Sequence, residues 1–294
     1  MVGVGSRVVV RYRLPAGSVP PLTDVIGHVV DVGPTLRVRT KRGDVVDIAM
    51  SDVVTIKALA AATVRTASIR HLEHAAALAW PGVEQERIGG WLLRFGHGST
   101  RRANSAVPLD VSGSADVSAI VDWYLGRDVV PLVAAPDRLL RLPSGVPTDA
   151  ENLVMTIDLP SGESGGAVTF GPRPDAEWLR LYRREVPIDV LTAVIDGEVT
   201  FAKIADAGVG RGAVTTAPDG TRWVGLSAVH VVEEARGRGV ARTLCAALLA
   251  WGFDRGATRA YTQVLADNTA AIALHESMGF SVHHRSRYVD ARSL

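Results

Sequence analysis

Hydrophobic and polar residues alternate in short runs over the first 58 residues of the chain. The runs are rich in valine and cover residues 6–13, 25–32, 35–40, 44–50 and 51–57. A period of two places successive side chains on opposite faces of a β-strand. Turn residues separate the runs, at Pro15 to Pro21, at Gly33 and Pro34, and at Gly43 and Asp44. The pattern therefore predicts five strands and no helix in this segment.

Five short strands in so few residues predict an SH3-like β-barrel over residues 1–58. Several basic residues would share its surface, namely Arg11, Arg13, Arg37, Arg39, Lys41 and Arg42. One face of such strands must contact water, so a solvated surface is favoured over a binding surface. The net charge of the whole chain is only +1, and nucleic acid is therefore not an expected partner.

A helical period replaces the alternation after residue 59. Ile69, Leu72, Ala76 and Ala79 recur at helical spacing until Pro81 and Gly82 end the pattern. Paired strands are expected at 89–95 and 99–107, a helix at 114–125 and a buried strand at 129–135. These elements predict a mixed α/β unit over residues 59–150. Residues 161–166 are expected to form a linker or a long loop.

A similar order of elements returns over residues 151–294. Strands are expected at 152–159 and 260–266, and helices at 174–186, 240–256 and 267–280. Two hairpins are expected between them, one over 189–206 that turns at Asp196 and Gly197, and one over 211–232 that turns at 217–220. The fold class is therefore a small all-β barrel followed by a mixed α/β sheet.

Composition limits the cellular compartments in which the protein is expected. The chain is 47% hydrophobic, yet no apolar run approaches the length of a membrane-spanning helix. Cys245 is the single cysteine, which excludes an internal disulfide. We expect a cytoplasmic protein that contacts no membrane. No spacing of ligand residues indicates a metal, and the oligomeric state is open, with a homodimer among the options.

The stretch "EEARGRGVARTLC", residues 233–245, joins a predicted strand to a predicted helix. Glycines at 237 and 239 allow the backbone to approach a ligand closely, and the helix start presents free N–H groups. Together they favour an anion such as pyrophosphate. A nucleotide-binding P-loop would need a lysine that is absent here, and a dinucleotide fingerprint would need a third glycine where Arg242 stands.

Residues 236–241 instead resemble the R/Q-x-x-G-x-G/A loop of the GNAT acyltransferases. The segment "DNTAAIALHESMGF", residues 267–280, resembles a second motif of that family, N-x-x-A-x-x-x-Y-E-x-x-G-F. The resemblance covers residues 150–294 and implies an N-acetyltransferase that uses acetyl-CoA. Residues 59–150 resemble the first half of tandem GNAT proteins of actinobacteria, some of which begin with an SH3-like domain. Because residues 108–118 lack the arginine and the glycine pair, that half is expected not to bind CoA. An unrelated α/β domain is the alternative.

The resemblance also implies a set of site residues. Backbone groups of Val229, His230 and Val231 would pair with pantetheine. The pyrophosphate would contact Arg236, Gly237, Arg238, Gly239, Val240, Ala241 and Arg242, and Asn268 would hydrogen-bond the cofactor. Strand alternation predicts that the His230 side chain faces away from the substrate if Val229 and Val231 face it.

His275 stands where many relatives have a tyrosine that protonates the departing thiolate, and it is the expected general acid. The family's strand glutamate is replaced by Gln263 or Leu265, so no general base is assigned. An ordered water or a carboxylate such as Glu185 remains open. The expected partners are acetyl-CoA and a primary amine on a small molecule or a protein. The alternative is a CoA-binding regulatory protein whose SH3-like domain recruits a partner.

Overall fold

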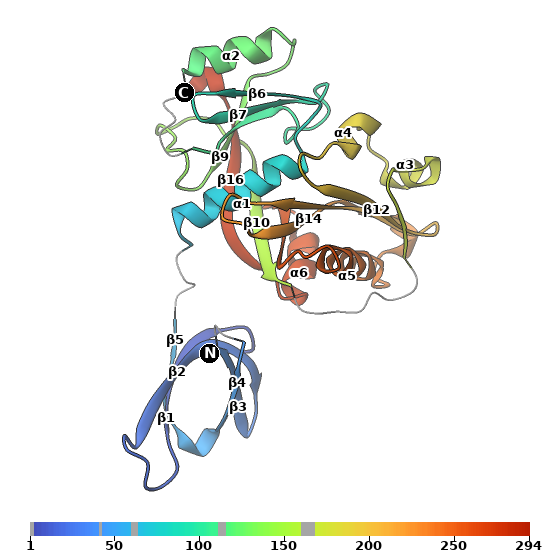
Figure 1. The fold of residues 1–294 in the computed structure, drawn as a ribbon. Helices are drawn as coiled ribbons and strands as arrows, with labels where there is room; N and C mark the ends of the chain where they lie inside the picture. The colour runs from blue at the N-terminus through green and yellow to red at the C-terminus, as the bar shows by residue number, and fades with distance from the viewer. Residues whose placement is uncertain (1–2, 41–42, 60–63, 111–115, 160–167) are drawn as a thin grey trace. The chain divides into compact units, whose positions relative to one another are not determined.

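The computed structural model describes residues 3–40, 43–59, 64–110, 116–159 and 168–294. The chain divides into two compact units, Met1–Thr63 and Val64–Leu294 (Figure 1). The linker expected at residues 161–166 lies outside the described residues. No helix in the described part is both long and apolar enough to span a membrane.

The N-terminal unit is a five-stranded antiparallel sheet, which confirms the five predicted strands. Its elements are β1 (Arg7–Arg13), β2 (Leu22–Val32), β3 (Thr35–Thr40), β4 (Val45–Ala49), a 3-10 turn (Met50–Asp52) and β5 (Val53–Ala58). The strand order is β4-β3-β2-β1-β5. Alternate residues of the strands, among them Val8, Val10 and Val38, form its buried core. The same alternation leaves the charged positions exposed, where Arg11 pairs with Asp24 and Arg37 with Asp47.

The second unit is built on one eleven-stranded sheet. Its strands are β6 (Glu84–Ile88), β7 (Trp91–Phe95), β8 (Ser105–Pro108), β9 (Leu132–Pro136), β10 (Asp149–Asp158), β11 (Thr169–Gly171), β12 (Glu198–Ile204), β13 (Gly208–Thr216), β14 (Arg222–Val231), β15 (Arg259–Leu265) and β16 (Ser281–Asp290). Their order in the sheet is β11-β12-β13-β14-β15-β10-β16-β9-β8-β7-β6. β16, which the sequence pattern did not predict, pairs with both β10 and β9. It therefore joins the two halves of the unit into one sheet.

The helices of this unit are α1 (Thr66–Ala79), α2 (Val117–Leu125), α3 (Ala176–Tyr182), α4 (Ile188–Thr192), α5 (Val240–Phe253) and α6 (Thr269–Ser277). Most strand neighbours are antiparallel, but β8 with β9 and β14 with β15 are parallel. A helix connects the strands of each parallel pair, α2 in the first half and α5 in the second. The two halves thus repeat one strand–helix–strand connection.

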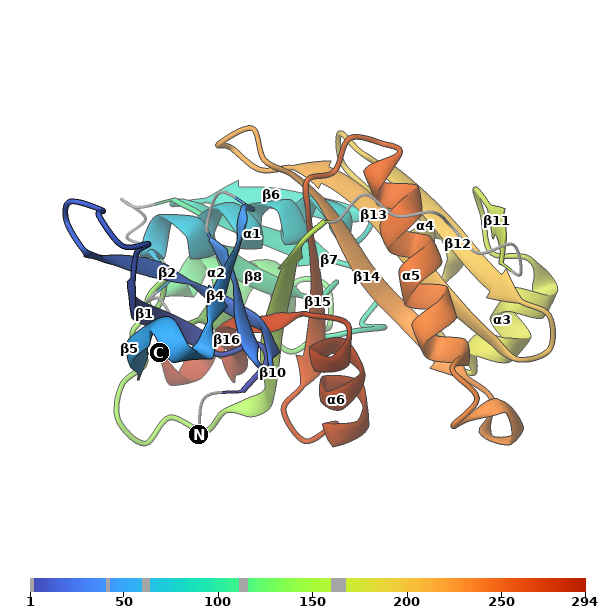
Figure 2. The same cartoon turned by 90° about the horizontal axis from the view of Figure 1, so that it is seen from below.

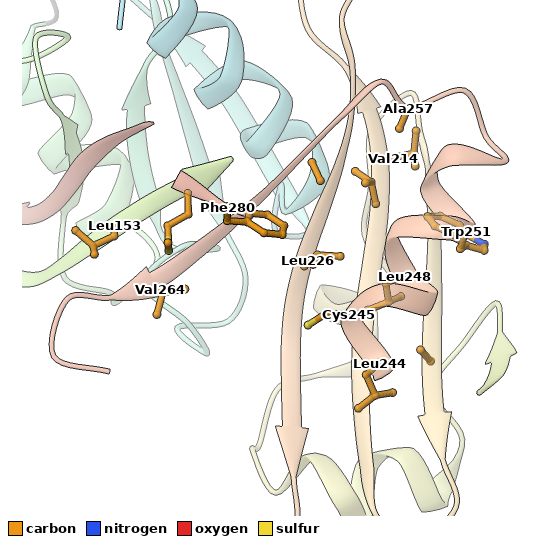
Figure 3. Packing of buried hydrophobic residues seen from close by; sticks show 14 residues of the cluster. Leu153, Val214, Leu226, Leu244, Cys245, Leu248, Trp251, Ala257, Val264 and Phe280 are labelled. Atoms are coloured by element: carbon orange, nitrogen blue, oxygen red, sulfur yellow. The ribbon is translucent and has the colours of Figure 1, made fainter. Parts of the chain in front are cut away.

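Helices cover both faces of the sheet around β13 and β14. On one face, called here the α5 face, Leu244, Leu248 and Trp251 pack against the sheet (Figure 3). The helix α6 lies beside α5 (Figures 1 and 2), and Arg242 of α5 donates to Ser277 of α6. On the opposite face, the α1 face, α1 and α3 both contact β13 and β14. The apolar stripe predicted on α1 is buried there, with Leu72 and Ala76 packed against Trp223 and Tyr261.

Two predicted elements are wrong in detail. The hairpin expected over residues 189–206 does not form, because Val190 and Leu191 enter α4 and join a buried cluster with Trp178. β12 begins only at Glu198, and its turn to β13 lies at residues 205–207. The helix expected at 174–186 ends at Tyr182, since Arg183 adopts a left-handed conformation with φ 56°.

Candidate active site

The parallel strands β14 and β15 separate part of the way along their length. Their pairing runs from Trp223 opposite Arg259 to Leu226 opposite Thr262, and it stops there. Beyond that point β14 pairs only with β13, while β15 continues beside β10. Figure 3 shows β15 diverging from β14 between Ala257 and Val264. The end of β14 that was predicted to pair with pantetheine is therefore an open strand edge facing the divergence.

A β-bulge lies at the start of this open edge. Ala228 has a φ of 51°, and the register with β13 shifts between Val209 and Arg211. A bulge of this kind redirects the side chains that follow it. Val229 and Val231 pack into the cluster under α5, so the His230 side chain points to the α1 face.

His230 therefore lies on the opposite side of the strand from Val229 and Val231, as strand alternation predicts. The two valines lie on the α5 face, and His230 is directed to the face of α1 and α3. The ring of His230 is half-buried, and its pKa is lowered by burial and by the charges of Arg236, Arg183 and Arg184. A neutral imidazole in this position is able to accept a proton. Glu185, the carboxylate considered as a base, is exposed.

The glycine loop presents a row of free backbone donors at the start of α5. Gly237 and Gly239 have φ values of 75° and 80°, which favour glycine. The six N–H groups from Gly237 to Arg242 have no hydrogen-bond partner among the described residues. Thr243 is the first residue of the helix whose N–H is bonded, to the Gly239 carbonyl. Six free donors at a helix start form a site suited to an anion.

The three arginines of the loop differ in the hydrogen bonds that their side chains form. Arg236 donates from Nε to the Val231 carbonyl at 3.4 Å, and the exposed Arg238 has no partner in the described structure. Arg242 donates to Oγ of Ser277 at 2.6 Å and so ties the first turn of α5 to the end of α6. Its side chain is therefore committed to Ser277, and only its N–H faces the proposed anion site. Asn268 caps α6 by accepting from the N–H of Ala271 at 3.1 Å.

His275 lies on α6 and is 5% exposed. Its ring contacts the Phe280 ring edge-on at a centroid distance of 5.1 Å. Burial lowers the pKa of His275 to about 4, so the ring is neutral at pH 7. Its Nδ1 is buried and has no hydrogen-bond partner in the described part of the chain. A neutral ring has no imidazolium proton to give until a nearby anion raises its pKa.

The α1 face carries polar residues that the sequence analysis did not select. Arg211 of β13 is 1% exposed, and its guanidinium lies 4.4 Å from the ring centroid of Trp80. Arg102 lies over the same indole at 5.7 Å. The one sequence signal for Arg211 is a charge inside the run "GVGRGAVTT", which otherwise reads as a buried strand.

The separated parallel strands, the bulge and the glycine loop are together the arrangement of a GNAT N-acetyltransferase. Two solved structures share the fold, a GCN5-related N-acetyltransferase from Kribbella flavida and an acetyltransferase of the GNAT family from Novosphingobium aromaticivorans. The first has a TM-score of 0.54 and 14% identity, and the match covers 76% of this chain and 96% of that one. The second has a TM-score of 0.53 and 18% identity, with coverages of 74% and 96%.

Within this class, residues 66–289 match the family described as "Probable histone acetyltransferase Rv0428c C-terminal", and the chain belongs to that family. Residues 2–57 match its companion, "Rv0428c N-terminal Sm-like domain", so the five-stranded unit is Sm-like.

Two curated relatives agree with this assignment. The Mycobacterium tuberculosis protein named "Probable histone acetyltransferase Rv0428c" is 51% identical over 294 residues, which is 99% of this chain and 97% of the relative. A Bacillus subtilis protein named "Uncharacterized N-acetyltransferase YobR" is 26% identical over 244 residues, with coverages of 72% and 94%. The chain is an acetyltransferase of the GNAT family.

Proposed function

We propose that the protein transfers the acetyl group of acetyl-CoA to a primary amine by direct attack. The observation that carries this proposal is the row of free N–H groups from Gly237 to Arg242, placed beside the point where β14 and β15 separate. The row would hold the pyrophosphate, and the open edge of β14 at Val229 to Val231 would pair with pantetheine. The two groups belong to one cofactor, which explains why they lie together.

The chemical step needs no further reactant. The amine nitrogen attacks the thioester carbonyl, the C–N bond forms, the C–S bond breaks, the amine gives a proton to water, and the departing thiolate takes one up. A backbone N–H on the open edge of β14, assigned here to Val231, would stabilise the oxyanion. His275 would deliver a proton to the thiolate, because a negative charge beside its ring raises the pKa from about 4. Asn268 would contact the cofactor from the start of α6.

The first half of the second unit would form a wall of the substrate cleft and bind no CoA. Residues 111–115 of its loop lie outside the described residues, but the helix that follows is described. The N-cap of α2 is Asp116, whose carboxylate accepts from the N–H of Ser118 at 3.0 Å. A carboxylate in this position uses a free donor of the helix and repels a phosphate.

The name of one relative indicates a class of acceptor. The name of the M. tuberculosis protein indicates a histone acetyltransferase, so a protein lysine is one class of acceptor to test. A small-molecule amine is the other. Both fit the chemistry above, since each supplies a primary amine that attacks once its ammonium form has lost a proton.

The cofactor site is tested by substituting Gly239→Asp. An added Cβ at Gly239 meets nothing within 4 Å, so the fold has room for the side chain while its charge would enter the pyrophosphate site. We expect acetyl-CoA affinity to fall by about 10- to 100-fold, measured by calorimetry. Gly220→Asp is the matched control, because Gly220 has a φ of 82°, is equally open and lies in the β13–β14 turn. Equal affinity in both variants would remove the loop from the cofactor site.

A further inference from the structure

Two cationic side chains share the indole of Trp80 on the α1 face. The guanidinium carbons of Arg211 and Arg102 lie 4.4 Å and 5.7 Å from its ring centroid, within range of cation–π attraction. Neither guanidinium forms an ion pair with a carboxylate in the described structure. Two like charges therefore lie close together without a counter-ion, which is an arrangement that favours an anion.

Arg211 holds this part of the fold together. It donates from Nε to the Leu191 carbonyl at 2.7 Å, and from Nη2 to the carbonyls of Ala79 at 2.9 Å and Ala193 at 3.0 Å. Its Nη1 reaches only the hydroxyl of Ser227, at 3.4 Å. Burial lowers the pKa of Arg211 to about 9, and the charge of Arg102 acts in the same direction. Arg211 is still a cation at neutral pH.

Arg102, in contrast, contacts the Trp80 ring but forms no hydrogen bond with the described residues. Its Nε is buried and makes no hydrogen bond with the described residues. The Nε1 of Trp80, which is 5% exposed, is also a buried donor without an acceptor there. Buried donors in native proteins are nearly always paired, because an unpaired one costs about 1–3 kcal/mol. Both donors would be satisfied by an oxygen from a ligand.

The residues that carry these donors line one small cavity. Its walls include Trp80, Arg102, Arg211, Ser227 and Tyr261, and its volume is about 10 Å³. That volume is about the size of one oxygen-sized group. Leu226, the last β14 residue paired with β15, also lines it, so the cavity lies next to the point where the strands separate. It therefore adjoins the place where the thioester would be held.

We propose that this cavity receives the carboxylate of the acceptor and that the acceptor is an amino acid or a similar amine with a nearby carboxylate. The proposal rests on the proposed function, because it places the amine beside the thioester. A cavity of about 10 Å³ admits one oxygen of a carboxylate, and a carboxylate oxygen accepts charge-assisted hydrogen bonds from a guanidinium. The lysine-rich tail of a histone would meet the charges of Arg102 and Arg211 and be repelled.

Matched pairs of amines test this proposal in the full-length protein. The twenty amino acids, their carboxamides, ethanolamine phosphate and a histone H3 tail peptide are each supplied with acetyl-CoA, and thiol release is followed. We expect at least one amino acid to be acetylated with a kcat/KM about 10- to 100-fold above that of its carboxamide, since charge-assisted hydrogen bonds to the carboxylate are lost in the amide.

Substitution of Arg102 identifies the cavity. Arg102→Gln should raise KM for the preferred amino acid by about 10-fold or more, with kcat, acetyl-CoA affinity and the KM of the carboxamide unchanged. Arg101→Gln is the matched control, because Arg101 is its exposed neighbour and pairs with Asp149. Trp80→Phe is the second variant, for use if Arg102→Gln does not fold. It keeps an aromatic ring but removes the Nε1 donor, and it should weaken the same preference for the amino acid over its carboxamide.

Other outcomes overturn the proposal. One is that a carboxamide, ethanolamine phosphate or the histone peptide is the best acceptor. Another is that Arg102→Gln changes KM for the amino acid and for its carboxamide equally. The third is that the protein binds acetyl-CoA but acetylates no amino acid. Failure of the proposed function is distinct from all of these, since it would appear as no acetyl-CoA binding and no thiol release with any amine.

Discussion

The phenol of Tyr261 on β15 lies directly against Gly225 on β14. A Cβ added at Gly225 would come under 3.0 Å from the Tyr261 side chain. The two strands are paired at this level, Gly225 opposite Tyr261, so neither backbone is free to withdraw. Glycine at position 225 thus allows the tyrosine to lie flat on the α1 face, beside the cavity of Trp80 and Arg102.

Gly225→Ala should therefore destabilise the protein. The added methyl group would displace Tyr261, and overpacking of a buried site typically costs about 1–3 kcal/mol. Chemical denaturation measures the loss. Gly33→Ala serves as the control, because an added Cβ at Gly33 meets nothing within 4 Å and its φ lies outside the left-handed region. An unchanged free energy of unfolding in Gly225→Ala would mean that the tyrosine is not held against the strand.

His275→Phe should lower turnover and leave acetyl-CoA affinity nearly intact. General acids typically contribute about 10²- to 10⁴-fold to a rate, so the loss would be plain in a thiol-release assay with an accepted amine. His275→Tyr should recover part of the rate, because it restores the donor that many relatives have at this position. Wild-type turnover in a folded His275→Phe enzyme would assign the ring to packing against Phe280 alone.

Stability should fall on acidification because of the same histidine. Its pKa is about 4 in the folded protein and 6.5 when free of its surroundings, so the unfolded chain binds the proton more readily between these values. The free energy of unfolding is thus highest above pH 6.5 and decreases toward pH 4. At pH 5 the contribution lost is about 2 kcal/mol. His275→Phe should show a shallower decrease from pH 7 to pH 5. Identical slopes in the two proteins would contradict the burial of a neutral ring.

A chain that begins at Val64 should keep its affinity for acetyl-CoA. The compact unit from Val64 onward contains its own buried clusters, the glycine loop and both strands of the divergence. Residues 1–58 were predicted as a separate domain on the basis of their strand-only pattern. Calorimetry on the folded truncated protein tests independence, and a loss of cofactor binding would show that the Sm-like unit contributes to the site. Substrate turnover is a separate readout and is free to change.

The elements with strong periodicity were predictable from the sequence. Leu244, Leu248 and Trp251 recur at helical spacing, and all three are buried on α5. The glycine loop was also predictable, because its residues are adjacent in sequence and its conformation is set by Gly237 and Gly239. The pairing of residues 229–231 with pantetheine was inferred from the family resemblance, and the divergence of β14 from β15 was seen only in the structure.

Other features depend on contacts between distant residues. β6 is the polar run "EQERI" at a sheet edge, so no apolar face marks it as a strand. β16 buries His284, and Glu73 from α1 pairs with it at 2.7 Å, a partner 211 positions away. The side of the sheet reached by His230 depends on the bulge at Ala228, which alternation alone does not reveal. The cavity of Trp80 and Arg102 is lined by residues from five separate segments of the chain, so no local sequence pattern predicts it.

The position of β16 bears on how the protein folds during synthesis. This strand leaves the ribosome after every other strand of the large sheet, yet its place is between β10 and β9. Until it arrives, both neighbours present unpaired backbone edges to the surroundings. The two halves can form their parallel strand–helix–strand connections early, but the joint between them closes last. A nascent chain at that stage is the species most exposed to pairing with other chains, and it is the one for which a chaperone would matter.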